Sequence, residues 1–209
     1  MKLLLIRHGE SEADLLGVHE GRADFPLTAL GERQAELMAT YIAETYSPQL
    51  ILTSPLKRAR KTAAILNEKI GCELVEEPLL KEFNNGVLAG LSREEAAIKY
   101  PLPKGGRPIH VPIQDGESEL DIRFRAENVL SKILVEYQEH DVVVLVSHGG
   151  LISNLLNSFL RQPINTEFIY PTGDTGIHLI ETKNQKRIVW YLNKQEHLIG
   201  IEDSMKLSR

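Results

Sequence analysis

The sequence predicts an α/β fold: a three-layer sandwich with a mostly parallel central sheet, helices on both faces and a small lid insertion. Short apolar, β-branched-rich runs such as Leu3–Ile6 and Val142–Val146 are typical of buried parallel strands. Segments with helical spacing of apolar residues alternate with these runs, as expected when helices cover both faces of a sheet. Residues 78–116 interrupt the alternation, and we interpret them as an insertion.

The first strand is expected over residues 2–7, because the apolar run ends there at a charged, glycine-containing loop. Thr28 can cap the next helix, which should run to about Tyr46. Its apolar residues recur near helical spacing, and Pro48 closes it.

A second short strand is predicted over residues 50–53 from its apolar run. Ser54 and Pro55 then resemble an N-cap followed by proline at the first helical position, which predicts a helix to about Ile70. The run over 72–75 is interpreted as the next strand.

The insertion over residues 78–116 is rich in proline and contains two glycine patches, so one short helix over 92–99 is expected within it. We expect this segment to lie over one end of the sheet as a partial lid rather than as a separate domain.

The second half of the chain returns to the alternation of helices and strands. We expect a long helix over 118–137, a strand over 142–147 and a helix over 149–160. Two closing strands are predicted near 176–182 and 187–192. The polar tail after about residue 198 is expected to be loosely ordered.

Length and composition are those of an ordinary globular protein. The 209 residues suffice for one buried core, so a single domain over 1–209 is expected. The net charge of −5 provides no overall basic field, so no nucleic-acid partner is expected. No apolar run is long enough for a signal peptide or a membrane helix, so no membrane partner is expected. The single cysteine, Cys72, excludes an intrachain disulfide. These features favour a cytoplasmic location, and they leave the oligomeric state open.

Two predicted strands stop at a histidine followed by glycine, at His8 and at His148. Active sites of open α/β sheets gather at the carboxyl ends of parallel strands, so both histidines are expected in one site. Arg7 beside His8 suits an anion better than an apolar core, because a guanidinium group binds phosphate oxygens through two parallel hydrogen bonds. Gly149 begins a helix whose free N–H groups also attract anions.

A second arginine, Arg58, lies in the first turn predicted for the helix after the second strand, one helical turn from Thr62. Histidine is a reasonable nucleophile toward phosphorus near neutral pH, and arginines can neutralise the transferring group. Metal-ligand spacing and a phosphate-binding Gly-x-x-x-x-Gly-Lys loop are both absent from the sequence. The residues therefore predict a phosphoryl-transfer site without metal or other cofactor.

Four motifs, LIRHGES, GRADFPLT, SPLKRARKTA and VSHGG, occur in that order and resemble the histidine phosphatase superfamily, also called the phosphoglycerate mutase-like family. The resemblance covers residues 1 to about 192 and is weakest in the lid. It implies that His8 is phosphorylated during turnover. It also implies that Arg7, Arg58 and His148 complete the phosphate pocket.

The resemblance further assigns the proton donor to Glu82 in LLKEFNNGVLAGLS, which would protonate the leaving oxygen and later help to activate water. A carboxyl group can serve this purpose where a lid partly excludes solvent. Gly21 and Arg22 fall where the family contacts the substrate or its phosphate. Ser11 and Gly149 are also expected to bind the phosphate.

Two positions depart from the family pattern. Asp14 stands where many members carry an asparagine that reaches the phosphate, and Glu20 replaces a frequent glutamine. Asp14 is expected at the phosphate pocket, where a carboxylate would repel a phosphate dianion unless it is protonated, paired with arginine or turned away.

The favoured function is metal-independent hydrolysis of a small-molecule phosphomonoester through a phosphohistidine. The first alternative is a cofactor-dependent phosphoglycerate mutase, which typically has Arg-His-Tyr after the acid and a paired arginine in the lid. Here Phe-Asn-Asn follows Glu82, and basic residues are scattered through the lid, which favours the phosphatase branch. The second alternative is a phosphate-binding module with weak or lost catalysis, which Asp14 keeps open. The physiological substrate stays open as well.

Overall fold

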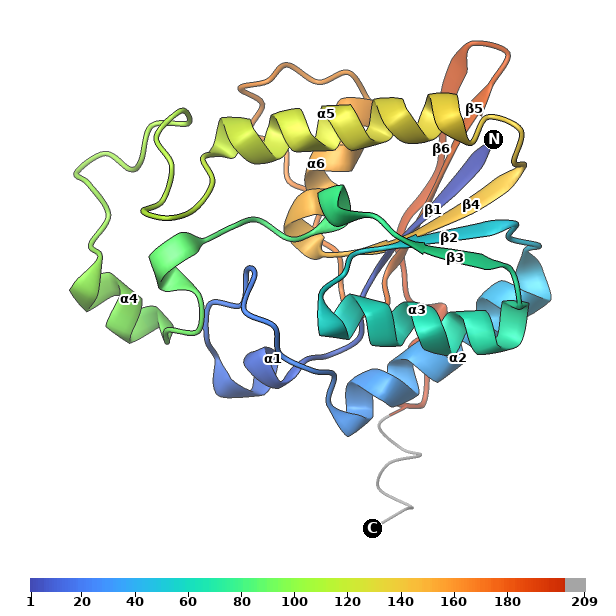
Figure 1. The fold of residues 1–209 in the computed structure, drawn as a ribbon, viewed down its shortest axis with the longest axis horizontal. Coiled ribbons are helices and arrows are strands. Elements are labelled where there is room, and N and C mark those ends of the chain that lie inside the picture. Colours follow the sequence, from blue (N-terminus) through green and yellow to red (C-terminus); the bar gives the residue numbers. More distant parts are fainter. Residues whose placement is uncertain (202–209) are drawn as a thin grey trace.

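The protein, described here for residues 1–201 of a computed structural model, folds around a six-stranded sheet of order β3-β2-β4-β1-β5-β6 (Figure 1). The strands are β1 (Lys2–Arg7), β2 (Leu50–Thr53), β3 (Glu73–Glu76), β4 (Val142–Ser147), β5 (Ile177–Lys183) and β6 (Lys186–Lys194). The first four strands are parallel, whereas β5 runs antiparallel to β1 and β6 antiparallel to β5. The predicted mostly parallel sheet is confirmed.

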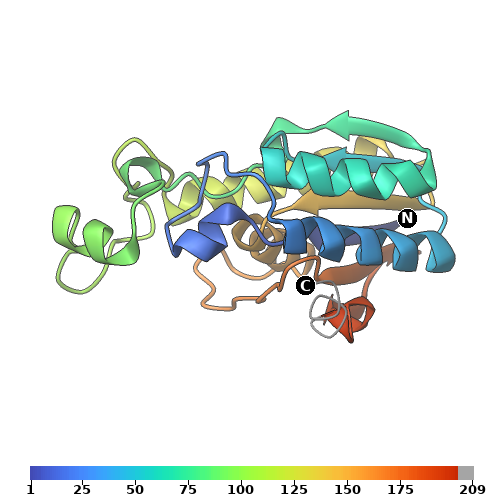
Figure 2. The ribbon, with the colours of Figure 1, turned by 90° about the horizontal axis from the view of Figure 1, so that it is seen from below.

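Helices cover both faces of this sheet, as predicted (Figures 1 and 2). The helices are α1 (Glu12–Leu16), α2 (Ala29–Thr45), α3 (Lys57–Ile70), α4 (Arg93–Lys99), α5 (Glu119–Glu136) and α6 (Gly149–Phe159), with short 3-10 turns at Pro78–Leu80, Gly86–Leu88 and Glu196–Leu198. Helices α5 and α6 share one apolar cluster with the sheet, and α2 and α3 share the other.

Strand β1 shows why its sequence is apolar without alternation. Leu3 and Leu5 belong to the cluster under α5 and α6, whereas Leu4 and Ile6 belong to the cluster with α2 and α3. All four side chains are buried. A strand that is covered on both faces must be apolar at successive positions, which accounts for the uninterrupted run.

One predicted helix start is wrong. Helix α3 begins at Lys57 with Leu56 as its N-cap residue, so Ser54 is not the cap and Pro55 precedes the helix. The N–H of Ser54 donates to the carbonyl oxygen of Val146 in β4, which prolongs the pairing of β2 beyond its last residue. The chain therefore leaves the sheet later than the Ser-Pro pattern predicted.

The predicted Thr28 cap agrees with the structure, and two further serines cap helices. The hydroxyl of Thr28 accepts the N–H of Gly31 at the start of α2. Ser92 and Ser118 form capping boxes at the starts of α4 and α5, respectively. Each cap satisfies an N–H group that the first helical turn leaves without an intrahelical partner.

The segment predicted as a lid contains α4 and two of the 3-10 turns. Both views show α4 and its flanking loops extending away from the sheet, with α1 between them and α2 (Figures 1 and 2). The backbone N–H of His19 donates to the carbonyl of Leu91, and the N–H of Gly90 donates to the carbonyl of His19. The segment is thus tied to the loop after α1, and its action as a lid stays a prediction.

The tail predicted to be loosely ordered begins after about residue 198, and its residues 202–209 lie outside the described residues. Within residues 1–201, no helix combines the length and apolar character needed to cross a membrane.

Candidate active site

The two histidines lie side by side because their strands are neighbours in register. Arg7 of β1 pairs with Ser147 of β4, so the next residue of each strand is His8 and His148. Their ring centroids are 5.0 Å apart, and both side chains are buried. The sequence prediction of one shared site at the carboxyl ends of the strands is therefore consistent with the structure.

The hydrogen bonds of His8 define its tautomer. Its Nδ1 lies 2.7 Å from the carbonyl oxygen of Gly9, and a carbonyl can only accept, so Nδ1 carries the proton. The Nε–H of Arg58 donates to Nε2 across 3.1 Å. Burial, together with the positive charges of Arg58 and Arg7, holds the pKa of His8 well below its usual value. His8 is thus a neutral ring with its lone pair on Nε2.

Arg58 is fully buried, and the loop before α2 fixes its guanidinium group. Its two terminal nitrogens donate to the carbonyl oxygens of Ala23 at 3.0 Å and Gly21 at 2.8 Å. Its Nε also lies 3.1 Å from a carboxylate oxygen of Glu20. This arrangement leaves the Nε edge of Arg58 facing His8.

Gly21 has a positive φ of 49°, and a Cβ there would lie 1.8 Å from the side-chain oxygen of Asn85. Only glycine therefore fits at this position in this conformation. The loop that supplies the carbonyl contacts to Arg58 depends on it.

Arg7 and Asp14 form an ion pair at the edge of the site. The guanidinium of Arg7 lies 3.2 Å from Asp174 and 3.6 Å from Asp14, and it donates to the carbonyl of Thr172. The other carboxylate oxygen of Asp14 accepts the backbone N–H and the hydroxyl of Ser11, closing the first turn of α1. Of the arrangements considered for Asp14, the structure shows pairing with arginine.

Glu20 lies at the face of His8 where a phosphoryl group would approach. One of its carboxylate oxygens accepts the hydroxyl of Ser11 at 2.6 Å, and the other lies 3.8 Å from Nε2 of His8. Burial raises the pKa of Glu20, although the charge of Arg58 opposes the rise. An acidic side chain therefore occupies part of the space expected for an anion.

His148 carries one satisfied and one free ring nitrogen. Its Nε2 lies 2.8 Å from the hydroxyl oxygen of Ser54, whereas its buried Nδ1 has no hydrogen-bond partner among residues 1–201. Burial and, after it, the charge of Arg58 hold the pKa of His148 well below its usual value. A buried polar atom without a partner next to His8 suits a bound ligand.

Glu82 sits at the amino end of α6, of which His148 is the N-cap residue. Its carboxylate accepts backbone N–H groups from Phe83 at 2.7 Å, Gly150 at 3.0 Å and Leu151 at 3.1 Å. A Cβ on Gly150 would lie 2.6 Å from the carboxylate, so the second glycine of the VSHGG motif makes room for Glu82. The two predicted catalytic groups therefore share one helix start.

Arg22 lies with Glu82 and is not among the hydrogen-bond partners of His8. Its Nε donates to the carbonyl of Glu82, and a terminal nitrogen lies 2.7 Å from a carboxylate oxygen of Glu117. Arg125 makes the same kind of contacts, at 3.1 Å to the carbonyl of Glu82 and 2.8 Å to Glu117. Burial would raise the pKa of Glu117, but hydrogen bonds from Arg125 and the N–H of Asn84 hold it below its usual value.

The sequence prediction missed several residues that position the site. They are Ser54, Glu117, Arg125, Thr172 and Asp174. Ser54 lies in the SPLKRARKTA motif but was interpreted as a helix cap, and no local motif marks the other four. A usable signal was the polar loop before β5, whose Thr and Asp follow a proline and could be expected at a sheet end.

Gly149, predicted to bind phosphate, is the first residue of α6, and a Cβ there would meet only Cδ of Arg7, at 3.9 Å. It also lines a cavity of about 510 Å³ together with Gly150 and Phe83. Among residues 1–201, no group of three or more His, Cys, Asp and Glu side chains is arranged to hold a metal ion.

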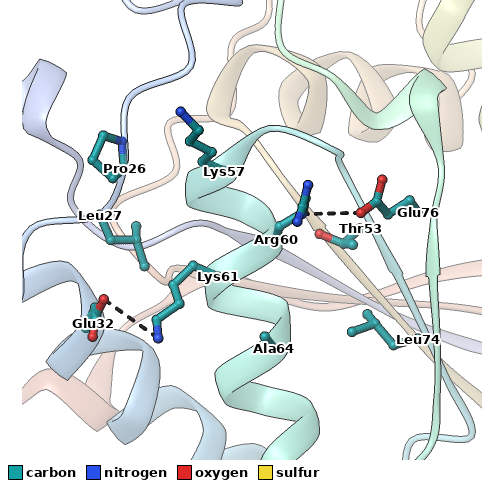
Figure 3. A pocket seen from close by; sticks show the side chains of 10 residues that line it. All are labelled: Pro26, Leu27, Glu32, Thr53, Lys57, Arg60, Lys61, Ala64, Leu74 and Glu76. Carbon is teal, nitrogen blue, oxygen red and sulfur yellow. Dashed lines mark ion pairs between the residues drawn. The ribbon is translucent and has the colours of Figure 1, made fainter.

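A separate cavity of about 600 Å³ lies between α3, β3 and the segment before α2 (Figure 3). Its basic side chains, Lys57, Arg60 and Lys61, form ion pairs with Asp24, Glu76 and Glu32, respectively. None of the predicted site residues lines it, and its cations are already paired. The histidine pair, not this cavity, is therefore the candidate active site.

Comparison with known proteins gives the same assignment. A family model described as histidine phosphatase superfamily (branch 1) matches residues 3–195. A "probable phosphoglycerate mutase GpmB" from Escherichia fergusonii is 34% identical over 168 residues, which are 78% of this chain and 76% of that protein. An "uncharacterized phosphatase PhoE" from Bacillus subtilis is 36% identical over 152 residues, 73% of this chain and 74% of that protein.

A solved structure extends the likeness to the fold. The α-ribazole phosphatase from Shigella flexneri superposes with a TM-score of 0.85 at 26% identity, covering 93% of this chain and 97% of that one. The family model spans nearly the whole sequence, including the segments that bear both histidines. The chain belongs to the histidine phosphatase superfamily.

Proposed function

We propose that this protein is a metal-independent phosphomonoester hydrolase that forms a phosphohistidine on Nε2 of His8, with Glu82 as proton donor. The observation that supports the proposal most is the state of His8. A neutral ring with its proton on Nδ1 has its lone pair on Nε2, which can attack phosphorus once the Arg58 Nε–H that it accepts turns to the phosphoryl group. The substrate is a small-molecule phosphate ester.

In the first step, the Nε2 lone pair attacks phosphorus and the bond from phosphorus to the ester oxygen breaks. The leaving oxygen takes a proton from Glu82 and departs as an alcohol. Arg7 and Arg58 offset the negative charge of the transferring group, which is the contribution that a metal ion makes in other phosphoryl-transfer sites. The free Nδ1 of His148 can form a hydrogen bond to a phosphoryl oxygen.

In the second step, Glu82 takes a proton from water as the water oxygen attacks phosphorus. The bond between phosphorus and Nε2 breaks, the lone pair returns to His8, and inorganic phosphate leaves. The three backbone N–H groups that donate to the Glu82 carboxylate hold it in position for this step. The first step requires Glu82 to enter it protonated.

A phosphoglycerate mutase is the second candidate, because relatives such as the E. fergusonii protein bear that name. In a mutase the phosphohistidine returns its phosphoryl group to a second substrate oxygen instead of to water. The Phe-Asn-Asn sequence after Glu82 and the paired state of Arg22 with Glu117 favour the phosphatase. Names of relatives such as the B. subtilis phosphatase agree with this choice.

The two candidates are separated by incubating the protein with phosphomonoesters and with 3-phosphoglycerate in the presence of a chelator. Release of inorganic phosphate without added metal supports the phosphatase. Isomerisation of phosphoglycerate that outpaces phosphate release and depends on a bisphosphate primer contradicts it. Phosphate binding without any turnover would instead favour a binding module.

The remaining parts of the proposal concern organisation and location. We propose one catalytic domain over residues 1–209, with residues 78–116 as a lid over the site. A cytoplasmic location is supported by the free thiol of Cys72.

A further inference from the structure

A cavity of about 510 Å³ borders the candidate active site on the side of Glu82. Its apolar lining comes from three separate places in the sequence: Phe83 after the acid, Ile122 on α5, and Ile169 with Pro171 on the loop before β5. The loop is held to α6, because the hydroxyl of Ser153 accepts its Tyr170 N–H at 3.0 Å. The apolar residues of this loop are thus fixed to α6, the helix whose backbone N–H groups bind the Glu82 carboxylate.

The cavity shares its boundary with the catalytic groups. Gly150 and Phe83 line it, and their backbone N–H groups both donate to the Glu82 carboxylate. Thr172 lines it as well, and its carbonyl accepts a hydrogen bond from Arg7. A phosphoryl group between Arg7 and Nε2 of His8 would therefore have its ester oxygen toward Glu82 and the substituent beyond it toward the cavity.

The described residues that line the cavity carry negative charge only. Among the described residues that line the cavity, Glu119 is the only charged side chain. No ion pair joins Glu119 to another residue within 1–201, so its charge is not neutralised there. The nearby arginines Arg22 and Arg125 are both paired with Glu117. A second anionic group on the substrate would meet repulsion in this cavity and find no free cation.

We propose that this cavity binds the alcohol part of the substrate and selects phosphomonoesters whose alcohol is apolar and carries no anionic group. The inference rests on the proposed function, since it assigns the leaving group of that reaction. Burial of an apolar substituent supplies the affinity, while Glu119 disfavours carboxylates and second phosphates.

The test compares two substrates with the same linker and similar leaving alcohols, 5-phenylpentyl phosphate and 5-carboxypentyl phosphate. We expect kcat/KM to be at least about tenfold higher for the phenyl compound, because only its end group gains from apolar burial. Equal values, or a preference for the carboxylate, would overturn the inference.

Matched variants test the apolar lining. Ile169→Ser should reduce the ratio of the two kcat/KM values, whereas Ile164→Ser, on the same loop but outside the cavity lining, should leave the ratio unchanged.

A second pair of variants tests the charge of Glu119. Glu119→Lys should raise kcat/KM for the carboxylate substrate relative to the phenyl substrate. Glu139→Lys makes the same charge change on the turn before β4 and should not alter the ratio. A ratio that responds equally to both lysine variants contradicts a local effect of Glu119.

Binding separates failure of this inference from failure of the proposed function. If neither ester is hydrolysed, the phosphatase proposal fails. Calorimetry with the phenylpentyl and carboxypentyl phosphonates then tests separately whether the cavity prefers the apolar group. Tighter binding of the phenyl phosphonate upholds the assignment of the cavity. Equal affinity, or tighter binding of the carboxylate, overturns it.

Discussion

Glu20→Gln is expected to strengthen phosphate binding, because Glu20 places a negative charge where the phosphoryl group must sit. A carboxylate oxygen of Glu20 lies 3.8 Å from Nε2 of His8, and its side chain is only 17% exposed. A reacting phosphorus atom would lie roughly 3–3.5 Å from the same nitrogen. The phosphoryl oxygens would therefore approach the carboxylate closely.

The size of the effect follows from Coulomb's law. Two unit charges about 4 Å apart repel by roughly 4 kcal/mol at an effective dielectric constant of about 20. If rotation of the carboxylate relieves two thirds of this repulsion, about 1.4 kcal/mol remains, which is a tenfold change in Kd. Glutamine keeps a side-chain oxygen that can accept the hydroxyl of Ser11, so the fold of the loop should persist.

The assay is calorimetric titration with inorganic phosphate, from about pH 7.5 down to about pH 5. Burial raises the pKa of Glu20, so acidification protonates a larger fraction of Glu20 than of an ordinary glutamate and weakens the repulsion. The advantage of Glu20→Gln over the wild type should therefore shrink as pH falls. The phosphate and the other charged side chains around the site are the same in both proteins.

Glu36→Gln is the matched control, since it removes the same charge from an exposed pair with Arg33. It should leave the Kd for phosphate unchanged. Unchanged or weaker phosphate binding by Glu20→Gln at neutral pH would refute the reasoning, and would mean that Glu20 helps to hold the anion.

Three further predictions follow from the geometry. Glu82→Gln should slow alkyl phosphate hydrolysis by about 10²–10⁴-fold. With p-nitrophenyl phosphate, whose leaving group needs no proton, the variant should still give a burst of nitrophenolate. An equal loss of rate for both substrates without a burst would contradict the assignment of Glu82 as proton donor. Gly150→Ala, which puts a Cβ 2.6 Å from the Glu82 carboxylate, should lower kcat by about 10²-fold with a small change in phosphate Kd. Gly149→Ala should lower kcat less, and similar losses of kcat in the two variants would argue against the steric reason. Burial lowers the pKa of His178 to about 4, so the folded state binds fewer protons at this residue than the unfolded state does. His178 alone should therefore lower the free energy of unfolding by about 2 kcal/mol between neutral pH and pH 5. NMR titration of the His178 ring checks the last prediction, and an ordinary imidazole pKa would exclude it.

The sequence could predict the centre of the site because its residues follow strands. The two histidines, His8 and His148, come directly after buried parallel strands. Arg58 lies in the first turn of the helix that follows another such strand. The edge at which such strands end is set by topology, so the residues after them meet without any knowledge of side-chain contacts. The alternation of strand and helix patterns predicted a sheet that is covered on both faces.

The residues that position Glu82 could not be predicted in this way. Glu117, just before α5, and Arg125, within it, contact the backbone of residues 79–84 from 33 to 46 positions along the chain. Their contacts depend on the path of the insertion, which has no regular periodicity to read. The five-residue helix α1 was missed for a similar reason, since it is too short to show an apolar stripe.

Ser54 shows how a local rule can be overridden by the sheet. Its Ser-Pro sequence is typical of a helix start, but its N–H pairs with β4 and its hydroxyl lies 2.8 Å from His148. A pairing between distant strands thus moved the helix start by two residues, from Pro55 to Lys57. The serine that looked like a cap instead contacts a candidate catalytic histidine.

The most direct test of the central claim is to trap the phosphorylated protein. The wild type is mixed with ³²P-labelled p-nitrophenyl phosphate, whose leaving group needs no proton, quenched within the first turnover and mapped by mass spectrometry. The proposed mechanism predicts an acid-labile phosphoryl group on Nε2 of His8, absent from His8→Ala and present in greater amount in Glu82→Gln. Label on another residue, or label that persists in His8→Ala, would contradict it.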